Sequence, residues 1–164
     1  MSPFAARRRG DPGRVIPPYG HRLRLADDDA RAHPFRFHRA ARRPLALLGV
    51  RPANAHVFVD AHVMHVSFGP WAIVTPATNV IAAEAVGALP VWRSLGVRCS
   101  SVDRALTFAT ARTGAVRLRF RDPVHRFGYS AALGHPTLTV TLERPELLLR
   151  QLRSRPAVIP PISR

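Results

Sequence analysis

The chain has 164 residues, of which 46% are apolar, and a formal net charge of +15. All 25 basic residues are arginine, so we attribute much of this charge to the codon usage of a GC-rich gene and discount it as evidence for nucleic-acid binding. No apolar run reaches the roughly 18 residues that a membrane-spanning helix needs, and the single cysteine, Cys99, excludes an internal disulfide. We therefore expect one folded domain in the reducing cytoplasm.

Residues 1–33 differ in composition from the rest of the chain. They contain few apolar residues, the runs Arg7-Arg8-Arg9 and Asp27-Asp28-Asp29, and no sustained hydrophobic period. This composition predicts a disordered basic arm. An alternative is that the segment is leader sequence translated from upstream of the true start. The arginine run is not followed by an apolar stretch, so an export signal is not expected.

A hydrophobic alternation of period two, which is typical of β-strands, begins near Pro34. Phe35 and Phe37 give a first short strand one aromatic face. Two further alternating runs lie within residues 56–68, on either side of Asp60-Ala61. We interpret these runs as a β-hairpin with the two central residues as its turn.

The middle of the chain is less regular. Gly69-Pro70 ends the hairpin, because proline lacks the amide hydrogen of a strand ladder, and a new strand is expected over residues 71–75. Residues 79–87 suit either a short helix or a strand, and both remain open. A short strand is expected within residues 92–99.

The clearest alternation lies in the last third of the chain. One strand is expected over residues 106–110 and the next over 116–121, where valine, leucine and phenylalanine alternate with three arginines. The turn residues Arg112-Thr113-Gly114 lie between these strands, so we predict a second hairpin. Residues 137–142 then form a further strand with a threonine face.

The final element is a predicted helix over residues 145–153. Pro145 can occupy a first helical turn without losing a hydrogen bond, and Glu146 lies near the positive end of the helix dipole. Leucines spaced three and four residues apart form an apolar stripe that must pack on another element. The tail, residues 154–164, is expected to be loose.

This order of elements predicts a mainly β domain over residues 34–153. We expect a small barrel or a curved antiparallel sheet that is capped by the C-terminal helix. The absence of alternating strands and helices excludes Rossmann and P-loop architectures.

Five short strings resemble an uncharacterised family of proteins from GC-rich bacteria. They are F-G-P-W at 68–71, T-P-x-x-N-V at 75–80, L-T-F-A at 106–109, R-F-R-x-P-V at 119–124 and H-P-x-L-T-V at 135–140. This family implies no activity, and the chain departs from it at Ala61 and Ala105, where the family has glycine. The strand count and terminal helix also resemble bacterial pleckstrin-homology-like (PH-like) domains, which are seven-stranded barrels capped by one helix, and imply a PH-like barrel.

His56 and His65 are weak candidates for a metal site. With a two-residue hairpin turn they would face each other, about 4.5 to 5.5 Å apart at Cβ. Zinc normally needs three or four protein ligands, and this spacing matches no metal motif. We favour a solvated strand face that carries two histidines, and expect neither a metal nor a cofactor.

Arg117, Arg119 and Arg121 are two residues apart, so they project from one face of a strand, and Arg126 follows nearby. Guanidinium groups donate paired hydrogen bonds to phosphates and carboxylates. The alternative is an ordinary polar strand face that codon usage has filled with arginine. These four arginines are the best candidate ligand-binding residues in the sequence.

Together these patterns predict a non-catalytic binding or scaffold module for an anionic ligand, a lipid headgroup or a partner peptide. Its partner would be a protein or an anionic membrane surface. One alternative is a carrier or enzyme with a small-molecule pocket between the sheet and the helix. A second is a nucleic-acid binder that uses residues 1–33. The carboxylates of residues 34–153 form no pair suited to acid–base catalysis, so an enzyme is not expected.

Overall fold

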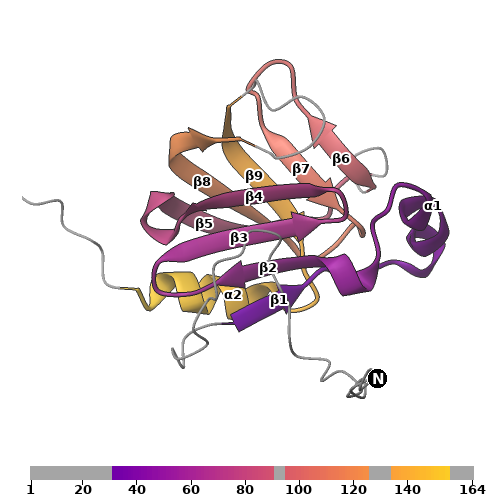
Figure 1. Cartoon of the computed structure of the whole chain (residues 1–164), viewed down its shortest axis with the longest axis horizontal. Helices are drawn as coiled ribbons and strands as arrows, with labels where there is room; N and C mark the ends of the chain where they lie inside the picture. The colour runs from indigo at the N-terminus through magenta and orange to yellow at the C-terminus, as the bar shows by residue number, and fades with distance from the viewer. Residues whose placement is uncertain (1–30, 91–94, 126–133, 156–164) are drawn as a thin grey trace, which may run out of the picture.

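The computed structural model describes residues 31–90, 95–125 and 134–155 (Figure 1). The strands are β1 (Arg31–Pro34), β2 (Ala55–Val59), β3 (Val63–Phe68), β4 (Trp71–Pro76), β5 (Val80–Val86), β6 (Gly96–Cys99), β7 (Leu106–Ala109), β8 (Ala115–Val124) and β9 (His135–Thr141). The helices are α1 (Arg42–Leu47) and α2 (Pro145–Arg153), with the 3-10 turns η1 (Arg39–Ala41), η2 (Pro52–Asn54) and η3 (Ala77–Asn79). The predictions of a mainly β domain and of a helix over residues 145–153 are confirmed.

Strands β1 to β4 form the first sheet, in chain order and with every neighbouring pair antiparallel. Short turns join β2 to β3 and β3 to β4, so each strand pairs with the next one along the chain. Alternate residues of β2 and β3 are buried, among them Val57, Val59, Met64, Val66 and Phe68. This is the face that the alternation predicts to be apolar.

Strands β5 to β9 form the second sheet, whose spatial order is β5-β8-β9-β7-β6. Strands β7 and β9 run parallel, and the other neighbours are antiparallel. Val116, Leu118 and Phe120 of β8 are buried, whereas the arginines between them are exposed. The predicted division of this strand into an apolar face and an arginine face is therefore confirmed.

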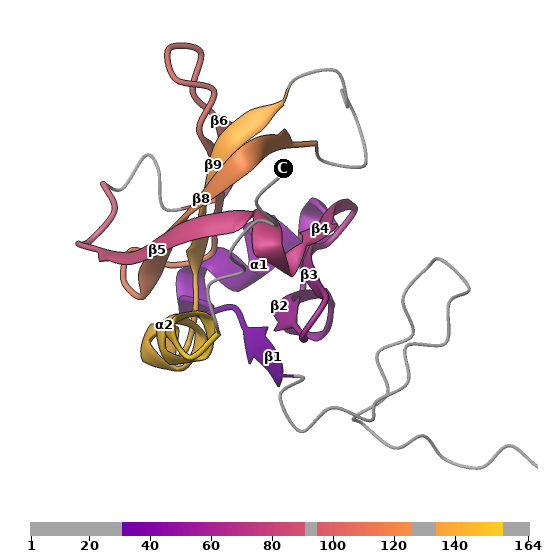
Figure 2. The same cartoon turned by 90° about the vertical axis from the view of Figure 1, so that its left-hand side faces the viewer.

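The two sheets pack face to face over one core, and their strands cross at a steep angle (Figure 1). Phe68 of the first sheet stacks on Phe108 of the second, with ring centroids 4.9 Å apart. Helix α2 lies across the end between the two sheets, where Leu148 and Leu149 are buried against both (Figure 2). Among the described residues the two sheets do not join into a closed barrel.

The predicted hairpin around Arg112-Thr113-Gly114 is wrong, because β9 lies between β7 and β8. Residues 110–114 pass over the end of β9 instead of forming a tight turn: the Leu142 amide donates to the Gly114 carbonyl at 2.8 Å. Gly114 has a φ of +78°, and the Leu142 carbonyl oxygen lies where a Cβ would be. Alternation shows which face of a strand is apolar, but it does not identify the neighbouring strand.

The first hairpin is present, but its predicted two-residue turn is wrong. Val59 pairs with Met64, two residues further along than the predicted partner His62. The Asp60 carboxylate accepts hydrogen bonds from the His62 and Val63 amides, both at 2.7 Å. This side-chain turn, which the letters Asp-Ala do not reveal, lengthens the loop and moves the register by two residues.

Smaller differences concern the ends of elements. Strand β1 begins at Arg31, so three residues that were assigned to the arm belong to the first sheet, and residues 1–30 lie outside the described ranges. Phe35 is buried but forms only an isolated bridge, to Leu142. Residues 80–86 form strand β5, which settles the open choice. Helix α1 was not predicted.

Candidate ligand-binding cavity

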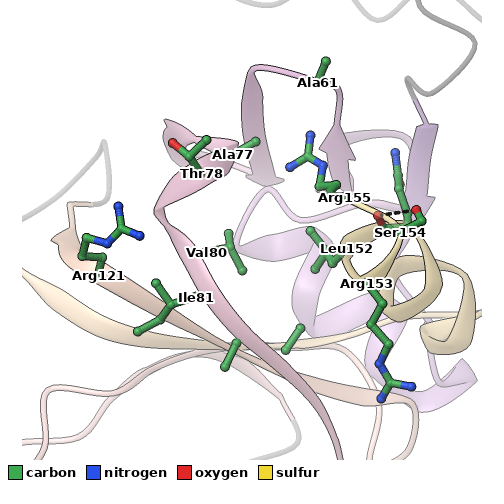
Figure 3. Close-up of a pocket in the computed structure, with 13 residues that line it drawn as sticks. Ala61, Ala77, Thr78, Val80, Ile81, Arg121, Leu152, Arg153, Ser154 and Arg155 are labelled. Carbon is green, nitrogen blue, oxygen red and sulfur yellow. Dashed lines mark hydrogen bonds between the residues drawn. The ribbon is translucent and has the colours of Figure 1, made fainter. Parts of the chain in front are cut away.

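A cavity of about 590 Å³ lies where the two sheets separate beside the C-terminal end of α2 (Figure 3). It is lined by Ala61 between β2 and β3, Ala77 and Thr78 of η3, residues 80–83 of β5, Arg121 of β8, and residues 151–155 at the end of α2. The second sheet, the helix, the loop between β2 and β3, and η3 therefore all contribute to it.

The cavity has an apolar middle and cationic sides. In Figure 3, Val80 of β5 and Leu152 of α2 lie in the middle, with Ile81 beside them. Arg121 lies on the side of β5 that is away from the helix, and Arg153 and Arg155 lie at the helix end. An occupant of the middle would meet apolar side chains, and the arginines lie farther out, with the Arg153 side chain directed away from Val80 and Leu152 in Figure 3.

The charge around the cavity is of one sign. None of the described residues that line it carries a carboxylate. Arg121 and Arg153 form no ion pair within the described ranges, whereas Arg117, on the same strand as Arg121, pairs with Glu84 at 3.3 Å. Guanidinium groups without an ion pair, such as those of Arg121 and Arg153, attract anions to a concave surface.

Asn79 fixes the strand segment that carries Arg121. Its side-chain amide donates to the Asp122 carbonyl at 2.9 Å, and its side-chain oxygen accepts from the Asp122 amide at 2.8 Å. The same amide group donates to the Thr75 hydroxyl at 2.8 Å. Because Asn79 is buried and bonds both backbone groups of Asp122, it ties η3 to β8 next to Arg121.

Gln151 holds the other side of the cavity. Its side-chain amide donates to the Val59 carbonyl at 3.1 Å, and its oxygen accepts from His33 Nε2 at 2.7 Å. Burial lowers the pKa of His33, an effect that the charge of Arg31 adds to and the hydrogen bond with Gln151 opposes. These two bonds fix the end of α2 to β1 and β2.

Three of the four arginines that the sequence singles out lie at alternate, exposed positions of β8. Arg117 and Arg119 lie on the exposed outer face of the second sheet, where Arg117 pairs with Glu84 and Arg119 lies between Ala82 and Thr137. Arg121 lines the cavity. Arg126 lies outside the described residues.

His56 and His65 lie diagonally across the first sheet, with ring centroids 6.2 Å apart. The longer loop places His56 opposite Ser67 and His65 opposite Phe58, so the predicted direct pairing of the histidines is wrong. Burial lowers the pKa of both side chains, and for His65 the neighbouring His56 adds to the effect. No group of three or more metal-binding side chains occurs in the described part of the chain.

Cys99 and His135 form a contact that the sequence does not indicate. Cys99 Sγ lies 3.8 Å from His135 Nδ1, but that nitrogen is 2.9 Å from the Arg104 carbonyl oxygen. A nitrogen facing a carbonyl must carry a hydrogen, so Nδ1 cannot take a proton from the thiol. This pair therefore lacks the base that an activated cysteine nucleophile needs.

Sequence reasoning finds Arg121 but misses the rest of the cavity. Arg153 and Arg155 follow the apolar stripe of α2, and arginine near a helix end is an ordinary feature. Asn79 stands out only as part of the T-P-x-x-N-V motif, which indicates no structural role for it. Gln151 has no local signal, because its hydrogen-bond partners are 92 and 118 residues away in the chain. Only the packing of α2 between the sheets makes these residues neighbours.

Compared with protein-family models, curated proteins and solved structures, the chain matches none. Within the described ranges, neither helix has the length and apolar content to cross a bilayer.

Proposed function

We propose that this protein is a binding module that holds a small amphipathic anion in the cavity beside α2. The observation that carries the proposal is that Arg121, Arg153 and Arg155 all line one cavity with an apolar middle, and that no described lining residue carries a carboxylate. The volume falls within the range of small-molecule sites, which also combine apolar walls with a few polar groups.

The chemistry of the lining residues selects the ligand class. Guanidinium groups donate paired hydrogen bonds to a phosphate or a carboxylate. Val80, Ile81 and Leu152 offer apolar surface for an alkyl or aromatic portion, whose removal from water contributes about 25 cal/mol per Å². A phosphate or carboxylate that carries an apolar group satisfies both features.

The architecture supports a binding role at a coarser level. PH-like domains are seven-stranded barrels capped by one helix, and this fold shares the strand-rich body and the C-terminal helix, although its strands form two sheets without closing into a barrel among the described residues and include a parallel pair. We therefore keep the PH-like assignment as a proposal about architecture. It assigns no ligand.

The experiment is calorimetric titration of the full chain with octyl phosphate, and with inorganic phosphate and octyl glucoside as probes of each half of the ligand. We expect saturable binding of octyl phosphate at one site and weaker binding of the other two. Arg121→Gln should weaken octyl phosphate binding roughly ten- to a hundredfold, since a hydrogen bond to a charged group contributes about 1.5–3 kcal/mol.

Arg119→Gln is the matched control. It lies on the same strand, two residues from Arg121, removes the same charge and does not line the cavity. We expect its affinity to stay within about twofold of the parent, because only long-range attraction is lost. Equal losses in the two variants would show adsorption to a basic surface and contradict the proposal, as would failure of octyl phosphate to bind.

A further inference from the structure

Two leucines at the end of α1 are exposed to solvent. Leu47 is 90% exposed and Leu48 is 52% exposed, whereas Leu45 and Val50 on either side of them are buried. Helix α1 projects from the end of the molecule opposite the C-terminal end of α2 (Figure 1). These leucines contribute little to the core, so their exposure calls for another explanation.

The backbone around the leucines is fixed. The amides of Leu48 and Val50 both donate to the Leu45 carbonyl, at 3.0 and 2.9 Å, and Gly49 donates to Ala46 at 3.0 Å. Asn54 donates to the Gly49 carbonyl at 2.9 Å. The chain thus presents Leu47 and Leu48 on a formed turn, and little conformational entropy remains to be lost when they are buried by a partner.

The surroundings of the leucines are basic. Between Arg31 and Val59 the chain has six arginines and no aspartate or glutamate. All six are exposed, and four of them lie within α1 or close to it in the chain: Arg39, Arg42, Arg43 and Arg51. Apolar side chains at the tip of a cationic surface are the composition of segments that lie in the headgroup region of anionic membranes.

We propose that the α1 tip, defined as Leu47 and Leu48 with these four flanking arginines, docks on an anionic bilayer surface. The leucines enter the boundary between headgroups and acyl chains, and the guanidinium groups contact lipid phosphates. A bilayer fits this surface better than a protein groove does, because anionic headgroups can meet several exposed arginines without requiring a matching set of acceptors. The site is independent of the cavity, which lies at the other end of the molecule.

The test is co-sedimentation of the full chain with vesicles of phosphatidylcholine alone and of phosphatidylcholine mixed with phosphatidylglycerol. A protein of this charge adsorbs to anionic vesicles through electrostatics alone, so the informative variant keeps every charge. The double substitution Leu47→Ser with Leu48→Ser should reduce partitioning onto the mixed vesicles at least tenfold. Val102→Ser, at a residue that is 94% exposed in the loop between β6 and β7, should leave it unchanged.

A second variant reports insertion directly. The emission of Leu47→Trp, measured as the difference from the parent, should shift to shorter wavelength on mixed vesicles and not on phosphatidylcholine alone, and Val102→Trp should show no shift. Unchanged partitioning of the double serine variant, or absence of the Leu47→Trp shift, would overturn the proposal and leave only electrostatic adsorption or a protein partner. Octyl phosphate binding in solution should be unaffected by the serine substitutions, which separates this test from that of the cavity.

Discussion

The first and second sheets contribute apolar faces to the same core, but they are assembled in different ways. Every pair in the first sheet joins strands that are consecutive in the chain, and short turns link β2 to β3 and β3 to β4. The second sheet inserts β9 between β7 and β8, and its parallel pair depends on residues 110–114 passing over the end of β9. Strands β2 to β4 of the first sheet are thus specified by local signals, and the second sheet depends on contacts between distant parts of the chain.

Removal of the Phe108 ring is the substitution expected to weaken the packing between the two sheets most. Phe108→Ala should destabilise the fold by about 3–5 kcal/mol, because both this ring and its stacking partner Phe68 are fully buried. Urea unfolding of this variant, of Phe68→Ala and of the double variant would give the coupling energy, for which we expect about 0.5–1.5 kcal/mol. Strictly additive effects would contradict the stacked arrangement.

The crossover in the second sheet is tested by Gly114→Ala. A Cβ at this position meets the Leu142 carbonyl oxygen, and its φ of +78° disfavours any side chain, so we expect a loss of about 1–3 kcal/mol in unfolding free energy. Gly87→Ala is the matched control, since nothing lies within 4 Å of its Cβ position. That variant should be neutral or stabilised by up to about 1 kcal/mol. Similar losses in both variants would argue for a simple hairpin turn at residues 112–114.

The attachment of α2 to the first sheet is tested by Gln151→Ala. The substitution leaves the Val59 carbonyl and His33 Nε2 without their partner, and we expect a loss of about 1–2 kcal/mol in the unfolding free energy. Arg150→Ala, at the exposed neighbouring position on the helix, should change it by less than about 0.5 kcal/mol. A neutral Gln151→Ala would show that apolar packing alone holds the helix.

Acidification should lower the stability of the fold through three histidines of the first sheet. His33, His56 and His65 all have lowered pKa values, mainly because of burial. Each pKa in the folded state lies below that of the unfolded chain, so the unfolded chain binds protons first as the pH falls below about 6.5. Stability should be highest above that pH and decline below it, until the folded-state pKa values are reached. Urea unfolding across this range would measure the decline.

The double substitution His56→Gln with His65→Gln should flatten this pH dependence, because it removes two of the three groups. Stability that rose on acidification through this range would contradict the direction of the shifts. If the unfolding free energy of the double variant depends on pH as steeply as that of the parent, the pH dependence comes from other groups.

The contrast between the sheets also shows how far the sequence could predict the structure. The buried faces of β2, β3 and β8 and the extent of α2 follow from period and from helix-start signals, and these predictions are confirmed. The pairing of β8 with β9 and the register of the first hairpin could not be predicted from the sequence. The first depends on a contact between strands that are distant in the chain, and the second on a hydrogen bond of the Asp60 carboxylate, and hydrophobic alternation reports neither. For the same reason the sequence indicates Arg121 as a candidate but does not indicate the cavity that it lines.

The cavity lies beside α2, where the helix connects the edge of the second sheet to the first sheet. Strand β5 is an edge of the second sheet, and α2 spans from it to β1 and β2 of the first. Arg121 therefore lines the cavity, while Arg119, two residues earlier on the same strand, is exposed but does not. The same residue type on one strand thus has two different environments, and only the cavity can surround a ligand.

The most direct measurement is methyl NMR of the isoleucines during titration with octyl phosphate. Ile81 lines the cavity, and Ile73 is buried in the core between the sheets. We predict a saturable shift of the Ile81 methyl signal with no change at Ile73, and loss of that shift in Arg121→Gln. Shifts at neither residue, or an Ile81 shift that persists in Arg121→Gln, would contradict an anion site in this cavity.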